Sequence, residues 1–287
     1  MLHFLPVTHS HALVVSGIRR CGKSVLLHQF ISNDVDDVFY FNSSKYNKES
    51  FVSYLEQGGF PEFLKIGNSE VLSFLIEDII HRDIATRYAI RDVSGLKRLC
   101  VYMMSNTAKL VSPSKLTSVI GVKSSSTVLE YLAHFESSYL LNLVPRFSWS
   151  VKGQMLSEKK VYVVDNGLVN VASISASKNY GRKFENTVYW SIRRKTKHIW
   201  YFADGHSECD FIYKLKEEYS AIQVCFEING DNQERELNGL LSALRFFKLR
   251  EGTILTIDQR DKILVDGCTI NVVPAFDFLP VALLDQV

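Results

Sequence analysis

Two short, wholly apolar runs near the start of the chain predict buried strands. Ala12–Val15 and Val38–Phe41 are such runs, and the segment between them has apolar residues at helical spacing. Uninterrupted apolar runs of this length are typical of strands that are covered on both faces. Residues 1–49 therefore predict a strand, a loop, a helix and a second strand.

From Ser50 onward the apolar positions recur with a helical period. One helix is predicted from Ser50 to the glycine pair at Gly58, and a longer one runs from Glu70 to about Tyr88. Both carry apolar side chains three and four positions apart, which places these side chains on one face. We interpret residues 50–93 as a helical connector.

Residues 94–170 predict three helices followed by a pair of strands. The helices are expected around Leu96–Met103, from Pro113 to Val119 and from Ser124 through Phe135, and the strands are Tyr139–Val144 and Lys160–Val164. This order of elements is that of a winged helix-turn-helix.

The remaining residues, 171–287, alternate between helical and strand patterns and predict an α/β unit. Its expected elements are a helix at Glu185–Arg193, strands at Ile199–Phe202, Asp210–Leu215 and Ala221–Ile228, a helix at Glu234–Phe247, and strands at Thr253–Ile257 and Ile270–Val273.

Composition narrows the class of protein without naming a partner. The chain has 287 residues, of which 46% are hydrophobic and 22% charged, as in a packed globular protein of about two domains. Its net charge of +2 is too small to argue for nucleic acid. The five cysteines have no paired spacing, which favours a reducing cytoplasm. No apolar stretch reaches the roughly 18 residues of a membrane span, so we expect no membrane partner.

One motif points to phosphate binding. The residues Gly17, Ile18, Arg19, Arg20, Cys21, Gly22, Lys23 and Ser24 satisfy G-x-x-x-x-G-K-S between a predicted strand and a predicted helix. In such a loop the backbone N–H groups surround the phosphates, the lysine reaches the β and γ phosphates, and the serine hydroxyl ligates Mg²⁺. The loop predicts ATP as the ligand, with Mg²⁺ held weakly through Ser24, and the two arginines would add positive charge.

An ATPase also needs a carboxylate at the end of a neighbouring strand. The only run of that type is Val161–Asp165, which lies far downstream of the loop. Asp165-Asn166-Gly167 also has the composition of a turn after a wing strand, and we favour that interpretation. The sequence therefore predicts ATP hydrolysis near background.

Several segments together resemble a family of prokaryotic AAA-type ATPases that carry the domain of unknown function 4143. They are the Gly17–Ser24 loop, the strand Val38–Asn42, and the segments Tyr54–Glu62, His81–Ile84 and Val161–Leu168. The resemblance implies ATP binding. The stretch that carries the Walker B acid, the sensor residue and the arginine finger in that family is missing between Asn42 and Tyr54, so the chain looks internally shortened.

The C-terminal unit resembles the restriction-endonuclease-like, PD-(D/E)XK, fold. The resemblance implies Glu185 as the helix acid and Asp210 as the strand acid, while Gln223 and Cys225 stand where an acidic-x-Lys pair is required. A neutral amide and a thiol cannot replace a metal-binding carboxylate and a fixed cation. We predict a retained fold without cleavage. A metal-dependent nuclease, with a lysine that has moved to Lys214 or Lys216, is the alternative.

The predicted recognition helix offers a weaker DNA signal. Lys123, Ser124, Ser125 and Ser126 lie at its start, but the helix continues with glutamates rather than cations. We therefore keep three hypotheses for the function. The first is an α/β multidomain ATP-binding protein in four parts, residues 1–49, 50–93, 94–170 and 171–287. The second is a non-enzymatic module that binds DNA, another protein or itself. The third is the metal-dependent nuclease.

Overall fold

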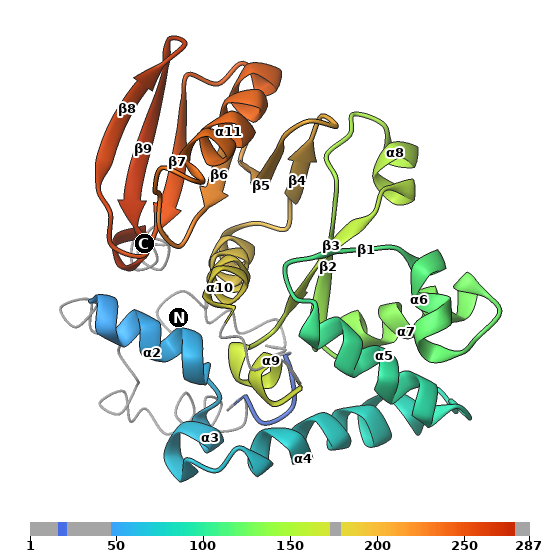
Figure 1. Ribbon diagram of the computed structural model, residues 1–287. Helices are drawn as coiled ribbons and strands as arrows, with labels where there is room; N and C mark the ends of the chain where they lie inside the picture. Colours follow the sequence, from blue (N-terminus) through green and yellow to red (C-terminus); the bar gives the residue numbers. More distant parts are fainter. Residues whose placement is uncertain (1–16, 22–46, 173–178, 279–287) are drawn as a thin grey trace, which may run out of the picture.

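The computed structural model describes residues 17–21, 47–172 and 179–278 (Figure 1). Most of the predicted phosphate-loop unit, including the strands Ala12–Val15 and Val38–Phe41, lies outside these residues. The described residues form a mixed α/β structure with two separate sheets. The coarse α/β class is thus confirmed.

Helices dominate the first half of the described chain. They are α2 (Lys48–Gln57), α3 (Pro61–Ile66), α4 (Glu70–Asp78), the π-helix η4 (Ile79–Ala85), α5 (Val93–Ser105), α6 (Pro113–Ile120) and α7 (Ser125–Ser137). Apart from α2, whose Phe51 and Leu55 pack with Phe184 in another core, these helices turn their apolar faces into one core, in which Leu72, Ile79, Leu99 and Phe135 are almost completely buried. The predicted helix Glu70–Tyr88 is present, but its second half winds as a π-helix. None of the described helices combines the length and the hydropathy that crossing a bilayer requires.

The first sheet has three strands in the order β1-β3-β2, all antiparallel to their neighbours. Its strands are β1 (Leu110–Val111), β2 (Leu141–Pro145) and β3 (Lys159–Val163). A short helix that the sequence did not predict, α8 (Val151–Leu156), lies in the connection between β2 and β3. Because side chains alternate along a strand, β3 turns Val161 and Val163 toward the helical core and Lys160 and Tyr162 the other way.

The second sheet has six strands in the order β4-β5-β6-β7-β9-β8. These strands are β4 (Ile199–Ala203), β5 (Glu208–Leu215), β6 (Glu218–Val224), β7 (Glu251–Thr256), β8 (Asp261–Val265) and β9 (Cys268–Pro274). Strands β4, β5 and β6 are antiparallel, whereas β7 is parallel to β6 and to β9. The edge strand β8 was not predicted from the sequence.

Two helices cover the opposite faces of the second sheet. Phe184 and Val188 of α10 (Tyr180–Lys195) share a core with Phe211. Leu240 of α11 (Gln233–Phe247) shares a different core with Ile212. Side chains that point to opposite faces of β5 thus pack into two different hydrophobic layers, as expected for a sheet that is buried on both faces.

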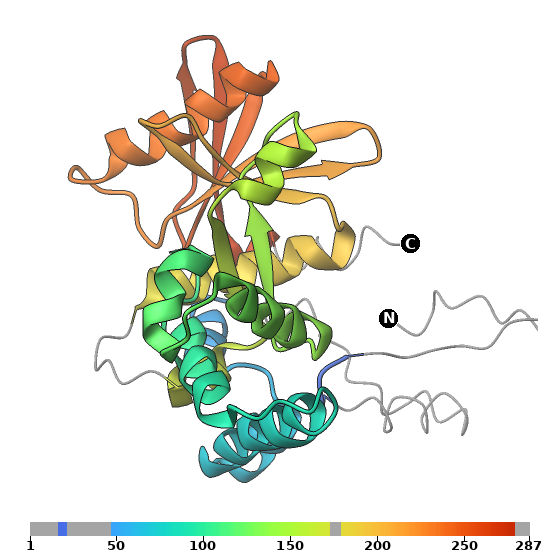
Figure 2. The ribbon, with the colours of Figure 1, turned by 90° about the vertical axis from the view of Figure 1, so that its right-hand side faces the viewer.

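Helix α10 also holds the two sheets together. Trp190 donates its indole N–H to the carbonyl of Val163 on β3 at 2.6 Å, and the side chain of Asn186 donates to the same carbonyl at 2.8 Å. Figures 1 and 2 show α10 between the helical part, in teal and green, and the sheet drawn in orange and red. Side chains on α10 and β3 are therefore well placed to meet residues of the second sheet.

Candidate functional site

A β-bulge in β5 aims Asp210 at α10. Trp200 of β4 pairs with Ile212 and Phe202 pairs with Cys209, so β5 has two residues, Asp210 and Phe211, where β4 has one. The extra residue of a bulge breaks the strict alternation of side chains. Phe211 and Asp210 consequently both face α10.

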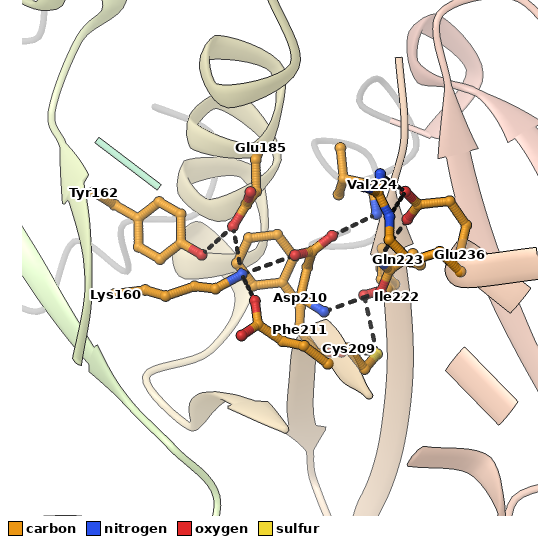
Figure 3. Close-up of polar contacts among 12 residues, drawn as sticks. Lys160, Tyr162, Glu185, Cys209, Asp210, Phe211, Ile222, Gln223, Val224 and Glu236 are labelled. Atoms are coloured by element: carbon orange, nitrogen blue, oxygen red, sulfur yellow. Dashed lines mark hydrogen bonds and ion pairs between the residues drawn. The ribbon is translucent and has the colours of Figure 1, made fainter. Parts of the chain in front are cut away.

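Lys160 enters this region from β3 and carries its ammonium into a group of carboxylates. Its Nζ lies 3.0 Å from Glu185 Oε1, 2.8 Å from Asp210 Oδ1 and 2.8 Å from Glu208 Oε1. Figure 3 shows the lysine extending from its strand with its ammonium between Glu185 and Asp210. The side chains of Lys160, Asp210 and Glu185 are 3%, 10% and 13% exposed, whereas that of Glu208 is 40% exposed and lies at the rim of the cluster. We call these four residues the Lys160 cluster.

Tyr162, two residues along the same face of β3, contacts the Lys160 cluster through Glu185. Its hydroxyl donates to Glu185 Oε1 at 2.7 Å, and its ring stacks on Tyr189 of α10 with centroids 4.3 Å apart. The same Glu185 oxygen thus accepts hydrogen bonds from both the ammonium and the phenol. These contacts fix the carboxylate in one orientation and tie β3 to α10.

Burial and the mutual charges decide the protonation states in the cluster. Burial opposes the ammonium of Lys160, but the carboxylates of Asp210, Glu185 and Glu208 outweigh it and hold the lysine pKa well above its usual value. Burial, together with the charge of Asp210, raises the pKa of Glu185 to about 7. Glu185 and Asp210 share one ammonium, so the negative charge of Asp210 opposes the ionisation of Glu185.

Gln223 holds the end of β5 and does not face the ammonium. Its amide oxygen accepts the backbone N–H of Asp210 at 3.2 Å, and its amide nitrogen donates to Glu236 of α11 at 2.7 Å. The second oxygen of Asp210 accepts the N–H of Val224 at 2.9 Å. Since β5 and β6 stop pairing beyond Phe211 and Ile222, these side chains satisfy the backbone groups left at the end of the ladder.

The other residues proposed for a nuclease site lie elsewhere. The thiol of Cys225 donates to the carbonyl of Glu227, and burial raises its pKa to about 11. Lys214 pairs with the exposed Glu217 at 2.8 Å. Lys216 is exposed in the β5–β6 turn, with a left-handed φ of 52°. Of the predicted residues, the structure brings together Glu185 and Asp210, with Gln223 one hydrogen bond away.

The described half of the phosphate-loop motif lies against the helical part. Ile18 is buried in the same core as Leu72. The guanidinium of Arg19 makes two hydrogen bonds to Asp83, at 2.9 and 2.5 Å, and this bonding raises its pKa further. The guanidinium of Arg20 lies 3.4 Å from the carboxylate of Glu62. Gly17 and Cys21 flank these residues, whereas Gly22, Lys23 and Ser24 lie outside the described residues.

Asp165 caps a helix, which corrects the predicted turn. The chain continues from Asn166 as α9 (Asn166–Ala172), because the apolar residues that follow pack into the helical core. The carboxylate of Asp165 accepts the N–H of Gly167 and the N–H of Gly59, each at 2.7 Å. Burial raises its pKa to about 6, against these stabilising hydrogen bonds.

The residues predicted to contact DNA stand at the start of α7. Lys123, Ser124, Ser125 and Ser126 are exposed, and the Ser124 hydroxyl accepts the N–H of Ser126 at 3.2 Å as an N-cap. The helix that follows exposes Leu129 and Glu130. Its outer face is therefore not basic.

Sequence reasoning missed two members of the cluster, Lys160 and Glu208, and also missed Glu236. A partial signal was present, because Lys160 is a lysine at the start of an otherwise apolar strand, on the same face as Tyr162. No pattern in the neighbouring residues indicated its partners Glu185 and Asp210, which lie 25 and 50 residues away in the sequence. Within the described ranges, no three His, Cys, Asp or Glu side chains are arranged to hold a metal ion.

Comparisons with known proteins match a family model other than the one expected, over part of the chain. Residues 48–178 match the model of a domain of unknown function, DUF8612. The chain is 32% identical over 243 residues to the uncharacterised protein MJ1544 of Methanocaldococcus jannaschii, which covers 78% of this chain and 54% of the relative. It is 28% identical over 193 residues to an uncharacterised protein of Haemophilus influenzae, which covers 65% of this chain and 48% of that protein.

These findings overturn the expected membership of the AAA-type ATPases with the domain of unknown function 4143. That expectation was wrong, because it depended on short motifs such as Gly17–Ser24, and a short glycine-lysine-serine loop can recur in unrelated chains. The matched family range begins at α2, after the loop, and runs past α9. This chain spans about half the length of the relatives it matches.

Proposed function

We propose that this chain is a non-enzymatic binding protein in which an internal lysine takes the place of a nuclease's metal ion. The order α10, β4, β5, β6, α11, β7, with β7 parallel to β6, supports a restriction-endonuclease-like arrangement of the second sheet. In such an arrangement Glu185 and Asp210 stand where the metal-binding acids belong.

The single observation that carries the proposal is the position of Lys160. Mg²⁺ needs several oxygen ligands at about 2.1 Å with room for water and substrate. Here the ammonium lies within 3.0 Å of the carboxylates that would supply those oxygens. A metal ion would have to displace a buried, fully paired cation, and the ligand set lacks the carboxylate that Gln223 replaces. The residues present therefore do not fit a resident metal ion.

Incubation of supercoiled plasmid with the protein and Mg²⁺ or Mn²⁺ tests this proposal. We expect no nicking above the level of a matched preparation of the Asp210→Asn variant, because the side chain that would hold the metal is engaged with Lys160 and Val224. Nicking by the native protein that disappears in Asp210→Asn would contradict the proposal. Equal weak nicking in both preparations would reveal a contaminating nuclease.

A protein partner is better supported than DNA. The order α5, β1, α6, α7, β2, β3, with β3 between β1 and β2, supports a winged helix-turn-helix. Its recognition helix, however, is preceded by one lysine, Lys123, and carries Glu130 and Glu136. DNA affinity depends mainly on cations that meet phosphates. We expect no retardation of duplex DNA in a gel-shift series, even at low salt.

Nucleotide binding is a second candidate, favoured by the way the Gly17–Ser24 loop begins. Ile18 is anchored in the core and Arg19 is fixed by Asp83, so this half of the loop is held before a ligand arrives. Gly17 has a φ of 155° and Arg20 a φ of 59°, which turn the chain sharply. A preorganised loop loses less entropy when it binds phosphate. ATP, with Mg²⁺ on Ser24, is the proposed ligand.

Titration with a fluorescent ATP analogue tests this second candidate. We expect saturable binding that is lost in Lys23→Ala and unchanged in Lys65→Ala, an exposed lysine on α3. ATP turnover should remain at background, since Asp165, the carboxylate considered for that role, is bonded to Gly59 and Gly167. Binding that does not depend on Lys23 would reject the phosphate loop as a site.

A further inference from the structure

An apolar surface surrounds α8, in the connection between β2 and β3. Trp149 is 72% exposed, Val151 72%, Met155 71% and Leu156 75%, and Phe246 of α11 adds a ring that is 45% exposed. Trp149 and Phe246 stack with centroids 6.3 Å apart, so the two elements form one continuous surface. Helix α8 lies at the outside of the molecule, facing the viewer in Figure 2. We call these five residues the α8 patch.

The α8 patch is firmly supported from beneath. Phe147 packs edge-on against Trp149 at 5.0 Å and against Phe247 at 4.6 Å. On the inner side of α8, Gln154 accepts the indole N–H of Trp200 on β4 at 3.0 Å. The helix is therefore held against the second sheet by one face, while its apolar residues point outward. A rigid apolar surface of this kind is favourable for binding because few groups must be ordered.

The size of the patch matches half of a protein interface. At these exposures the five side chains leave on the order of 600 Å² of surface in water, at the upper end of the patches found on monomers. A standard protein interface covers about 800 Å² on each partner. Charge is sparse, because Lys152 is the only charged residue between Ser148 and Ser157. A polyanion such as nucleic acid would require more cations.

We infer that the α8 patch is the self-association surface of this protein, and that its occupant is the α8 patch of a second copy. We place the two-fold axis across α8, perpendicular to its length, so that the two α8 helices are antiparallel. The start of one helix then faces the end of the other, which brings Lys152 opposite Glu158 of the second copy. Glu158 is 43% exposed, and its existing partner, Lys115, is itself 80% exposed, so this carboxylate remains accessible to a second cation.

This inference names a partner for the proposed interaction role and rests on that role. The two can fail separately. A monomeric protein that does not nick plasmid would reject self-association and leave the proposed function standing. A nicking activity that depends on Asp210 would reject the proposed function whatever the oligomeric state.

Sedimentation velocity of the full chain, from low micromolar to several hundred micromolar protein, measures the association. We expect a monomer–dimer equilibrium that Leu156→Asp weakens by at least roughly a hundredfold, since burying a new carboxylate in an apolar interface costs several kcal/mol. The matched control is Leu264→Asp. Leu264 is 77% exposed on β8, at the opposite edge of the second sheet, and its substitution should leave the dimer unchanged.

A charge exchange tests the antiparallel pairing. Lys152→Glu and Glu158→Lys should each weaken the dimer, because like charges then face each other. The double variant should restore it to within about threefold of the native protein. Thermal unfolding of each variant confirms that the fold is retained. A protein that is monomeric throughout the concentration range, a dimer that is indifferent to Leu156→Asp, or a double variant no better than the single ones would overturn the inference.

Discussion

At the residue scale, the most unusual feature of this protein is an excess of buried acid around a single lysine. Glu185 is held with a pKa of about 7 in the folded state, against 4.5 for an ordinary glutamate. The folded state therefore binds more protons than the unfolded chain between these values. The raised pKa of Glu185 therefore stabilises the folded state fully below pH 4.5, and this stabilisation decreases as the pH rises toward 7.

We expect Glu185→Gln to flatten the pH dependence of the free energy of unfolding. The native protein should lose roughly 3 kcal/mol from this group as the pH rises through the window between the two pKa values. Asp165, with a pKa of about 6, adds a loss of the same sign at lower pH. The slope between pH 6 and 7.5 therefore belongs mainly to Glu185, and urea unfolding across that range measures it.

The control is Glu234→Gln, which removes an exposed carboxylate on α11 and should leave the slope unchanged. If Glu185→Gln retains the native slope between pH 6 and 7.5, Glu185 is ionised throughout that range and the account of the cluster is wrong. An equal change in both variants would point to a general charge effect.

The sequence could indicate only part of the cluster at this scale. Glu185 and Asp210 were expected from the resemblance of their helix and strand to a nuclease fold. The direction of the Asp210 side chain depends on the bulge in β5, which a regular alternation of side chains along the strand does not predict. Lys160 belongs to a different sheet, and its contacts depend on how the two sheets pack. Such a contact leaves no pattern in the residues that surround it.

At the scale of elements, the turn between α2 and α3 is built around Asp165. Gly58 has a left-handed φ of 77°, and a Cβ on it would collide with the Asp165 carboxylate. The same carboxylate accepts the N–H of Gly59 and caps α9. The glycine pair is thus required by a carboxylate that lies more than 100 residues away in the sequence.

We expect Gly58→Ala to destabilise the protein by about 3 kcal/mol or more, because the new methyl group must push Asp165 away from its N–H donors. Gly67→Ala is a matched control. Gly67 has a similar φ of 74° but no atom within 4 Å of an added Cβ, so its substitution should cost only about 1 kcal/mol. Chemical denaturation measures both. Equal losses in the two variants would mean that the contact with Asp165 contributes little.

The periodic elements were predicted more reliably than the irregular ones. Helices α2, α5, α7 and α11 were expected because their apolar residues repeat at helical spacing over several turns. Helix α8 was missed because its apolar residues face water, so no buried stripe marks it. Helix α9 was predicted as a turn, because Asp165-Asn166-Gly167 has turn composition and the packing that makes it helical comes from α2, α4 and α5.

At the scale of the whole molecule, Lys160 joins the two sheets. We expect Lys160→Met to cost about 3–5 kcal/mol at pH 8, the usual cost of leaving buried charges without their partner. The loss should be smaller at pH 5.5, where the uncompensated carboxylates can take up protons. Hydrogen exchange should accelerate in β3 and in β5 together, because the lysine contacts both sides of the junction.

The control here is Lys115→Met, which removes a lysine that is 80% exposed in its pair with Glu158. Surface pairs contribute less than about 1 kcal/mol, so little change is expected. A Lys160→Met protein as stable as this control at pH 8 would show that the cluster is not a buried ionic junction.

Lys160 lies on β3, whereas its carboxylate partners lie on α10 and β5, and this matters when the chain is divided into fragments. A fragment that starts at residue 179 would retain Glu185, Glu208 and Asp210 but leave their cation behind on the discarded piece. Without that cation, the mutual repulsion of the three carboxylates would favour their protonated forms and weaken the packing of β5 against α10. The stability and the proton uptake of such a truncated product would therefore be properties created by the cut.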